Sequence, residues 1–329
     1  MEKEKSIKKS NRELTIVTGF FDCGRGKHQE QARSNQKYLD FFRKWARIQN
    51  KLIVYTTKEF EKEIGFIRRE FGREEQTHII IIDKLDSVEP EILKEMKKVE
   101  ADVIFQKWRA RDYDVSNLAS YNYIMLMKYW MLRDAISRFP EIETVVWLDF
   151  GWNHGGKVFP HEKEFDFLWE YDFDKRKVHL FAKKRPDNEL GFLKLQVMTD
   201  GIMGSPVICS RNTADKLYMY VKEAMWSLLS LDAMDDDQML LTMSYKRHPE
   251  LFYVHDSDWF LPMKEYGGGH LTVREKQNND SNGTSIFYKI RKHGLKKLII
   301  LFYVQYIKHS TLERYYLEKR VHKIFEKVM

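Results

Sequence analysis

The sequence predicts an α/β fold built on a mostly parallel β-sheet with helices on both of its faces. Short runs of β-branched and aromatic residues alternate with segments whose apolar residues recur at helical spacing. The short runs are apolar throughout, as in strands that are covered on both faces of a parallel sheet. With 329 residues, the chain is long enough for one large domain or two small ones.

The first half of the chain alternates most regularly. Strands are expected at 13–18, 51–56, 77–83 and 143–149, and helices at 30–47, 59–71, 89–98 and 120–138. Past residue 149 the pattern is looser, with strands expected at 178–182, 205–210 and 251–256 and helices at 211–231 and 235–245. Ligands of open parallel sheets bind at the carboxyl ends of the strands. Asp149 and Asp83 lie at such ends, as does the pair Thr18 and Gly19.

Charge is distributed unevenly along the chain. The net charge is +7, and residues 285–329 hold eleven Lys or Arg against three Glu, so this segment carries +8 and the rest of the chain −1. The neutral body argues against nucleic-acid binding, which favours basic and aromatic residues interleaved along a groove. The start of the chain lacks the apolar core of a signal peptide, and the two cysteines, Cys23 and Cys209, favour a reducing cytoplasmic compartment.

Four regions are expected: a charged N-terminal tail (1–12), a catalytic domain (13–274), a polar linker (275–285) and a basic amphipathic helical tail (286–329). The apolar run 298–307 in the tail is shorter than the ~20 residues that a membrane span needs. The tail either lies on an anionic membrane surface, on the inner face of the plasma membrane, or packs on the body with solvated basic faces.

The segment TVVWLDFGWNHGG, residues 144–156, is the most informative stretch. It runs from a buried strand into one carboxylate, Asp149, and then into glycines. A carboxylate at a strand end can hold a divalent cation, and glycines let a diphosphate approach the backbone. The alternative is an ordinary turn or N-cap aspartate.

Other candidates have structural alternatives of the same kind. Gly201 and Gly204 would leave a bare surface for a sugar ring, or belong to a turn after Asp200. Asp236 and Asp237 stand in an acidic run before a helix, where an acid caps the helix or acts as a catalytic base. The candidate phosphate-binding residues are Arg25, Arg33 and Lys128, although Lys128 fits a solvated helix position equally well. The candidate histidines are His154, His255 and His270.

Several blocks together resemble the HtrL/YibB family, also called WlaTC-like, which is regarded as a family of glycosyltransferases from bacterial surface-polysaccharide loci. The blocks, which lie between residues 13 and 270, are TIVTGFFDCGRG, RSNQKYLDFFRKWARIQNKLIVYT, VVWLDFGWNHG, DGIMGS and DDDQMLLTMSYKRHPELFYV. The resemblance implies a GT-A-like (Rossmann-like) sheet whose Asp-x-Asp motif holds Mn²⁺, or Mg²⁺, and the UDP diphosphate. Asp149 takes the first position of that motif, and Gly151 stands where the second Asp is expected.

The resemblance also implies a site. Asn153, His154 or His255 completes the cation site, with His255 favoured, or the enzyme depends little on metal, or activity is lost. The expected nucleotide-binding residues are Thr18, Phe20 and Tyr55. Gly151, Gly201 and Gly204 leave room for the donor, and Asp236 or Asp237 faces the acceptor.

The expected function is a glycosyltransferase, of the hexosyltransferase type, that moves a sugar from a UDP-sugar to a saccharide or lipid-linked acceptor. The alternative is a catalytically inactive protein that binds nucleotide-sugar or polysaccharide. The identities of donor and acceptor, and the choice between inversion and retention, stay open.

Overall fold

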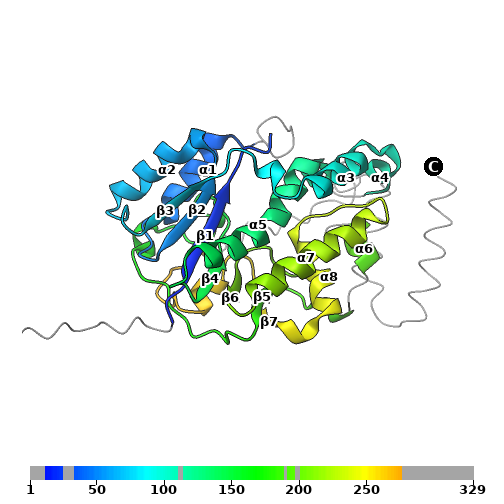
Figure 1. The fold of residues 1–329 in the computed structure, drawn as a ribbon. Coiled ribbons are helices and arrows are strands. Elements are labelled where there is room, and N and C mark those ends of the chain that lie inside the picture. Colours follow the sequence, from blue (N-terminus) through cyan, green and yellow to red (C-terminus); the bar gives the residue numbers. More distant parts are fainter. Residues whose placement is uncertain (1–11, 25–32, 110–113, 189–190, 197–200, 276–329) are drawn as a thin grey trace, which may run out of the picture.

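The structure is a computed structural model, and it describes residues 12–24, 33–109, 114–188, 191–196 and 201–275. In this part of the chain, seven strands form one central sheet in the order β3-β2-β1-β4-β6-β5-β7 (Figure 1). The strands are β1 (Thr15–Phe20), β2 (Leu52–Thr56), β3 (Thr77–Ile81), β4 (Thr144–Trp147), β5 (Val178–Ala182), β6 (Val207–Ser210) and β7 (Phe252–Asp256). Only β6 runs antiparallel to its neighbours, β4 and β5, and the other adjacent pairs are parallel. The predicted α/β class with a mostly parallel sheet is confirmed.

Helices cover both faces of this sheet, as the apolar strands require. The helices are α1 (Asn35–Trp45), α2 (Lys58–Glu70), α3 (Pro90–Ala101), α4 (Val103–Trp108), α5 (Ala119–Arg138), α6 (Gly191–Gln196), α7 (Ala214–Leu229), α8 (Asp237–Arg247) and α9 (Pro262–Glu265). Short 3-10 helices lie at Leu85–Ser87, Asp114–Asn117, Trp152–Gly155, Glu162–Phe165, Pro186–Asn188 and Pro249–Leu251. Each helix expected between residues 30 and 245 therefore has a counterpart within a few residues of its predicted ends.

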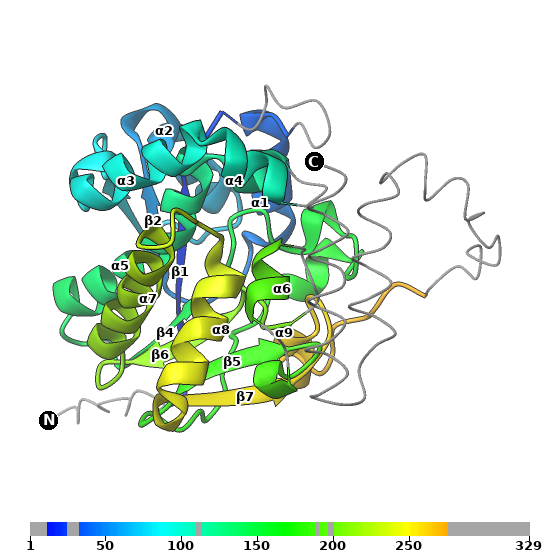
Figure 2. The same ribbon diagram turned by 90° about the vertical axis from the view of Figure 1, so that its right-hand side faces the viewer.

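Alternate residues of the central strands point to opposite faces and create two apolar layers. Val17 and Ile53 pack with α3, α5, α7 and α8, whereas Ile16 and Val54 pack with α1 and α2. Figure 2 shows α7 and α8 side by side on the first of these faces. Because the sheet is buried on both faces, the edge at the carboxyl ends of β1 and β4 is the natural place for a binding site.

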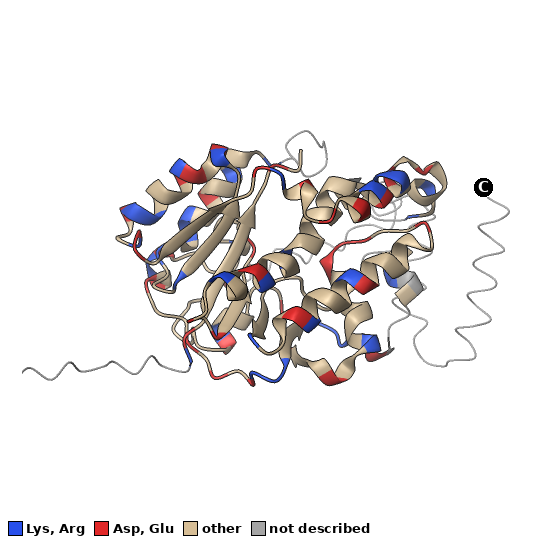
Figure 3. Ribbon diagram, viewed as in Figure 1, with Lys and Arg blue, Asp and Glu red and all other residues tan. Residues whose placement is uncertain are grey.

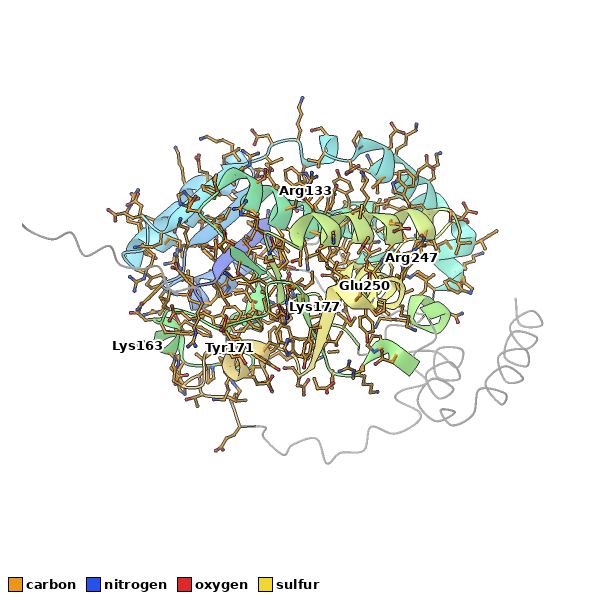
Figure 4. All side chains as sticks on the ribbon, turned by 60° about the horizontal axis from the view of Figure 1, so that its bottom comes forward. Arg133, Lys163, Tyr171, Lys177, Arg247 and Glu250 are labelled. Atoms are coloured by element: carbon orange, nitrogen blue, oxygen red, sulfur yellow. The ribbon has the colours of Figure 1, made fainter. Side chains whose placement is uncertain are left out.

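Charged residues lie mainly on the helices and loops (Figure 3). The seven strands contain a single Lys, Arg, Asp or Glu, which is Asp256 at the end of β7. Near the beginning of β5 and β7, the ammonium of Lys177 donates to the main-chain oxygen of Glu250, and the two labelled residues lie next to each other in Figure 4.

Among the described residues, no helix is both long and apolar enough to cross a membrane. The predicted tail 286–329 lies outside the described residues, as does all of the predicted linker except residue 275. The division of the chain into these regions stays a prediction.

Candidate functional site

The carboxyl ends of β1 and β4 open into a cavity of about 290 Å³. This volume is close to the lower end of the range for ligand pockets, about 300 Å³. The walls come from the segments that follow β1 and β4, from one side of α5, from the start of α8 and from the loop at 259–260. The predicted binding residues among the walls are Phe20, Arg33, Lys128, Asp149, Gly151, Gly204, Asp236 and Asp237. The structure therefore brings most of the predicted site residues together.

Lys128 is the central cation of the cavity. It projects from α5, and its side chain is only 3% exposed. Its Nζ lies 2.8 Å from Asp149 Oδ1 and 2.5 Å from Asp237 Oδ2. Burial acts to lower the pKa of Lys128, but the carboxylates of Asp149 and Asp237 outweigh it and raise that pKa above its usual value. The alternative interpretation of Lys128 as a solvated helix residue is therefore wrong.

Asp149 lies two residues after the end of β4. One of its carboxylate oxygens, Oδ1, is bonded to neighbouring side chains. Its Oδ1 accepts a hydrogen bond from the indole Nε1 of Trp147 at 2.8 Å, in addition to the ion pair with Lys128. Its backbone N–H donates to the hydroxyl of Ser205 at 3.0 Å. The side chain nevertheless remains 45% exposed and lines the cavity. Asp149 is thus fixed in position and still accessible to a ligand.

The acidic run before α8 divides into three roles. Asp235 is fully buried and pairs with Arg109 at 3.0 Å. Asp236 is the N-cap of α8, and its side chain accepts from the backbone N–H of Gln238. Asp237 is the first residue of α8 and turns its carboxylate to Lys128. The expectation that at least one of these acids caps the helix is met by Asp236.

Asp237 has an unusual environment for a carboxylate, since its side chain is only 7% exposed. Burial raises its pKa to about 6, and the negative charges of Asp236 and Asp149 act in the same direction against the ammonium of Lys128. Because the N-terminus of a helix favours negative charge, α8 supports the ionised form. A carboxylate with such a pKa is suited to exchange a proton near neutral pH.

Glycines in the site make room for protein side chains. A Cβ on Gly204 would lie 2.0 Å from Asp237 Oδ2, and a Cβ on Gly151 would lie 2.9 Å from the ring of Tyr38. That these bare faces also accommodate the donor stays a prediction. Gly204 and Gly151 line the cavity, but they are needed because Asp237 and Tyr38 pack against them.

The loop after Asp149 is held in a left-handed conformation. Asn153 and His154 have φ of 59° and 42°, which Asn tolerates better than most residues. The Asn153 side chain accepts from the N–H groups of Val158 and Phe159 and donates to the carbonyl of Phe159. These bonds explain the asparagine in the WNHGG segment, and they place His154 in the wall of the cavity.

A second basic group, the guanidinium of Arg33, also lines the cavity. Arg33 comes just before α1, and its guanidinium lies 5.9 Å from the ring centroid of Phe41 and 3.4 Å from His154 Nε2. Arginine presents several N–H donors in a planar fork that suits phosphate oxygens. Arg33 and His154 are thus placed to contact an anionic ligand.

Six predicted residues within the described part of the chain do not line this cavity: Thr18, Tyr55, Asn153, Gly201, His255 and His270. The Nε2 of His270 lies 2.9 Å from the main-chain oxygen of Glu164. Thr18 is buried inside β1, and the hydroxyl of buried Tyr55 donates to Asp134 Oδ2 at 2.8 Å. Gly201 is buried beside β5, where its carbonyl accepts from Lys183 N–H. His255 is discussed below. Of the predicted β1 residues Thr18 and Phe20, only Phe20 lines the cavity, together with the neighbouring Gly19. Arg25 lies outside the described residues.

The predicted pairing of Asp149 with His255 does not form. Strands β6 and β5 separate β7 from β4, and the Nε2 of His255 lies 2.9 Å from the Nδ1 of His179. Burial and the neighbouring His179 lower the pKa of His255 to about 4. The order of the strands is the physical reason, because it puts the two side chains on different parts of the sheet.

The residues present do not form a cation site of the expected kind. The described part of the chain contains no group of three or more His, Cys, Asp or Glu suited to hold a metal ion. The amide of Asn153 is used inside its loop, and an ammonium already lies between the carboxylates of Asp149 and Asp237. A divalent cation prefers several oxygen ligands that converge on one point.

Some wall residues outside the predicted set also have a signal in the sequence. Tyr121, Met125 and Lys128 recur at helical spacing along α5 and line the cavity together. Trp259 and Phe260 follow the carboxyl end of β7, the position at which parallel sheets bind ligands. Both signals point to the same edge of the sheet. Nothing in the local sequence predicts the contribution of Ser205.

Comparisons with known proteins agree over most of the chain. A family model described as "Bacterial protein of unknown function (HtrL_YibB)" matches residues 12–266. Protein HtrL of Escherichia coli (strain K12) is 26% identical over 264 residues, which cover 75% of this chain and 90% of that protein.

Two solved structures have a distant likeness to the chain. The crystal structure of mouse xyloside xylosyltransferase 1, apo form, is 14% identical with a TM-score of 0.40, covering 74% of this chain and 85% of that one. The structure titled PaToxG glycosyltransferase is 10% identical with a TM-score of 0.33, covering 72% of this chain and 70% of that one.

Proposed function

This chain belongs to the HtrL_YibB family of bacterial proteins, and we propose that it is a glycosyltransferase that uses a nucleotide-sugar donor. The observation that supports this proposal most is the position of Asp149, exposed at the carboxyl end of β4 and fixed by buried Lys128. A cavity lined by both cationic and carboxylate groups has the two kinds of group that sugar transfer from a diphosphate requires. We propose UDP as the nucleotide and a saccharide or lipid-linked saccharide as the acceptor.

In this proposal, the donor diphosphate lies near Arg33 and His154, and the donor sugar lies toward Asp149. As the bond between the anomeric carbon and the diphosphate oxygen breaks, the diphosphate leaves with the bonding electrons. Arg33 stabilises the negative charge that collects on it. The aromatic walls at Trp259 and Phe260 exclude water from the reacting bond.

The acceptor hydroxyl is activated by a carboxylate at the start of α8. In an inverting transfer, the acceptor oxygen forms the new bond to the anomeric carbon while its proton passes to Asp237 or Asp236. Asp237 is the better base by its environment, since its pKa is raised to about 6. In a retaining transfer, the same group stabilises the positively charged sugar instead.

The acceptor class follows from the proposed setting. A hexosyltransferase that builds bacterial surface polysaccharide would meet its growing chain on a lipid carrier at the inner face of the membrane. The predicted basic tail, residues 286–329, would attract anionic lipid at about 1 kcal/mol per cation close to the surface.

The release of nucleoside diphosphate from a panel of UDP-sugars and other nucleotide-sugars tests the proposal. Wild-type protein should release UDP, and Asp149→Asn should lower the rate at least about tenfold. Asp215→Asn is the matched control, since Asp215 pairs with Arg133 on the surface and its side chain is 80% exposed. Saturable UDP-sugar binding without release would favour the alternative, an inactive nucleotide-sugar-binding protein. The absence of both binding and release across the panel would contradict the proposal.

A further inference from the structure

Lys128 occupies the place where the site would otherwise need a cation. Helix α5 packs against both β4 and α8, and Lys128 projects between them. Its Nζ contacts one carboxylate from each side, Asp149 at 2.8 Å and Asp237 at 2.5 Å. Two carboxylates that face each other across so short a gap repel unless a positive charge lies between them.

We infer that Lys128 is a built-in replacement for the divalent cation, so that this site binds the donor diphosphate without metal. The inference rests on the proposed function for the identity of the ligand. The replacement of the cation by Lys128 is independent of that function, because it concerns only the side chains of Lys128, Asp149 and Asp237.

The surroundings fix the ammonium in this position. The Nζ of Lys128 lies 5.7 Å from the ring centroid of Trp147, a distance typical of a cation–π contact. Trp147 also donates its indole N–H to Asp149, so the ring orients both partners of the ion pair. Only 3% of the Lys128 side chain is exposed, so the two carboxylates and the ring of Trp147 surround the ammonium where it lines the cavity.

On its Gly204 side, the Asp237 carboxylate leaves no space for an added ion. Asp237 packs directly on the backbone at Gly204, where even a methyl group would lie 2.0 Å from Oδ2. A metal ion of the Mg²⁺ or Mn²⁺ kind needs about six oxygen ligands around it. Such an ion could take the place between the two carboxylates only after the ammonium had left.

An alternative is that Lys128 serves only the stability of the fold. The two possibilities differ in what happens when the ammonium is removed. A purely structural lysine leaves a damaged site, whereas a lysine that replaces a cation leaves two carboxylates arranged to bind one. The gain of metal binding therefore separates them, and it requires no knowledge of substrate or activity.

The experiment is a titration with Mn²⁺ alone, followed by electron paramagnetic resonance of the free ion. Wild-type protein is expected to show no saturable binding. Lys128→Met should gain one saturable Mn²⁺ site and should be stabilised against heat by the ion. The double variant Lys128→Met with Asp149→Asn should lose that site. Lys222→Met, which removes a partly exposed lysine paired with Glu89, is the matched control and should bind no Mn²⁺.

Two results of this titration overturn the inference. One is saturable binding of Mn²⁺ to wild-type protein that Asp149→Asn abolishes. The other is a folded Lys128→Met variant that gains no site, or gains one that the Asp149 change does not remove.

Measurements on wild-type protein decide the case if Lys128→Met does not fold. The dissociation constant for UDP, measured by calorimetry with EDTA and with Mn²⁺, should agree within about twofold. Tightening by Mn²⁺ of about tenfold or more overturns the inference. If UDP binds in neither buffer, the proposed function fails, and the titration of wild-type protein with Mn²⁺ still decides the inference.

Discussion

A Cβ atom on Gly204 would lie 2.0 Å from the carboxylate oxygen of Asp237 that pairs with Lys128. The backbone before β6 and the first residue of α8 therefore define each other's position. This contact connects a glycine that the sequence singled out to the charged centre of the cavity.

Gly204→Ala should displace Asp237 and weaken its pairing with Lys128. Overpacking of this kind typically costs about 1–3 kcal/mol. Urea unfolding should show that loss, and turnover should fall with it. Gly269→Ala is the control, since a Cβ there meets nothing within 4 Å. Equal stability of the two variants would show that the Asp237 carboxylate is not confined by the backbone.

The pH dependence of activity should report Asp237. Burial raises its pKa from 3.8 to about 6, so the proposed base is protonated and inactive in acid. The value of kcat/KM should therefore fall as the pH decreases below about 6. The Asp236→Asn variant should keep this decrease of kcat/KM in acid. The residual activity of Asp237→Asn should not show it. If kcat/KM of Asp237→Asn still decreased in acid as it does in wild-type protein, a group other than Asp237 would be responsible for the pH dependence.

Folding stability should respond to the same group with a definite sign. Because the folded state holds the Asp237 proton more tightly than the unfolded chain does, this carboxyl lowers stability as the pH rises from 3.8 to about 6. Urea unfolding of wild-type protein and Asp237→Asn across this range should diverge toward the higher pH. Parallel profiles would contradict a raised pKa.

Arg33 should contribute to nucleotide affinity and little to stability. Removal of a charged hydrogen bond to phosphate typically costs about 1.5–3 kcal/mol, so Arg33→Ala should weaken UDP binding at least about tenfold. Calorimetry measures the effect. Arg43→Ala, which removes an arginine of α1 that pairs with Glu70, should bind UDP as wild-type protein does. Equal losses in both variants would refute a specific role for Arg33.

The buried pair of Arg109 and Asp235 should be a requirement of the fold. Both side chains are fully buried, and removing one partner of such a pair typically costs about 3–5 kcal/mol. Urea unfolding should detect this loss in Arg109→Met and a partial recovery when Asp235→Leu is added. Arg69→Ala, which breaks an exposed pair with Glu74, should have no measurable effect. A stable Arg109→Met protein would refute this prediction.

Local patterns were sufficient to predict most elements of the sheet and helices. The apolar runs correspond to β1, β2, β3 and β4, because strands covered on both faces need apolar residues at every position. Asp149 could be found for the same reason, since a charge directly after such a run marks the strand end. The mostly parallel direction followed from the helices between the strands.

The rest of the site depends on contacts between distant segments. The burial of Lys128 follows from the packing of α5 against β4 and α8, which helical spacing does not reveal. The separation of His255 from Asp149 follows from the order of the strands, which a single sequence does not specify. Gly204 has a bare face because Asp237, 33 positions later, approaches it.

The structure of the protein in complex with UDP would test most directly whether this cavity holds the donor. We expect the diphosphate in the cavity, within hydrogen-bonding distance of Arg33, and the exposed side of the Asp149 carboxylate facing the place of the sugar. Lys128 should stay between Asp149 and Asp237. A nucleotide bound elsewhere on the protein, with this cavity filled by solvent, would contradict the proposed function.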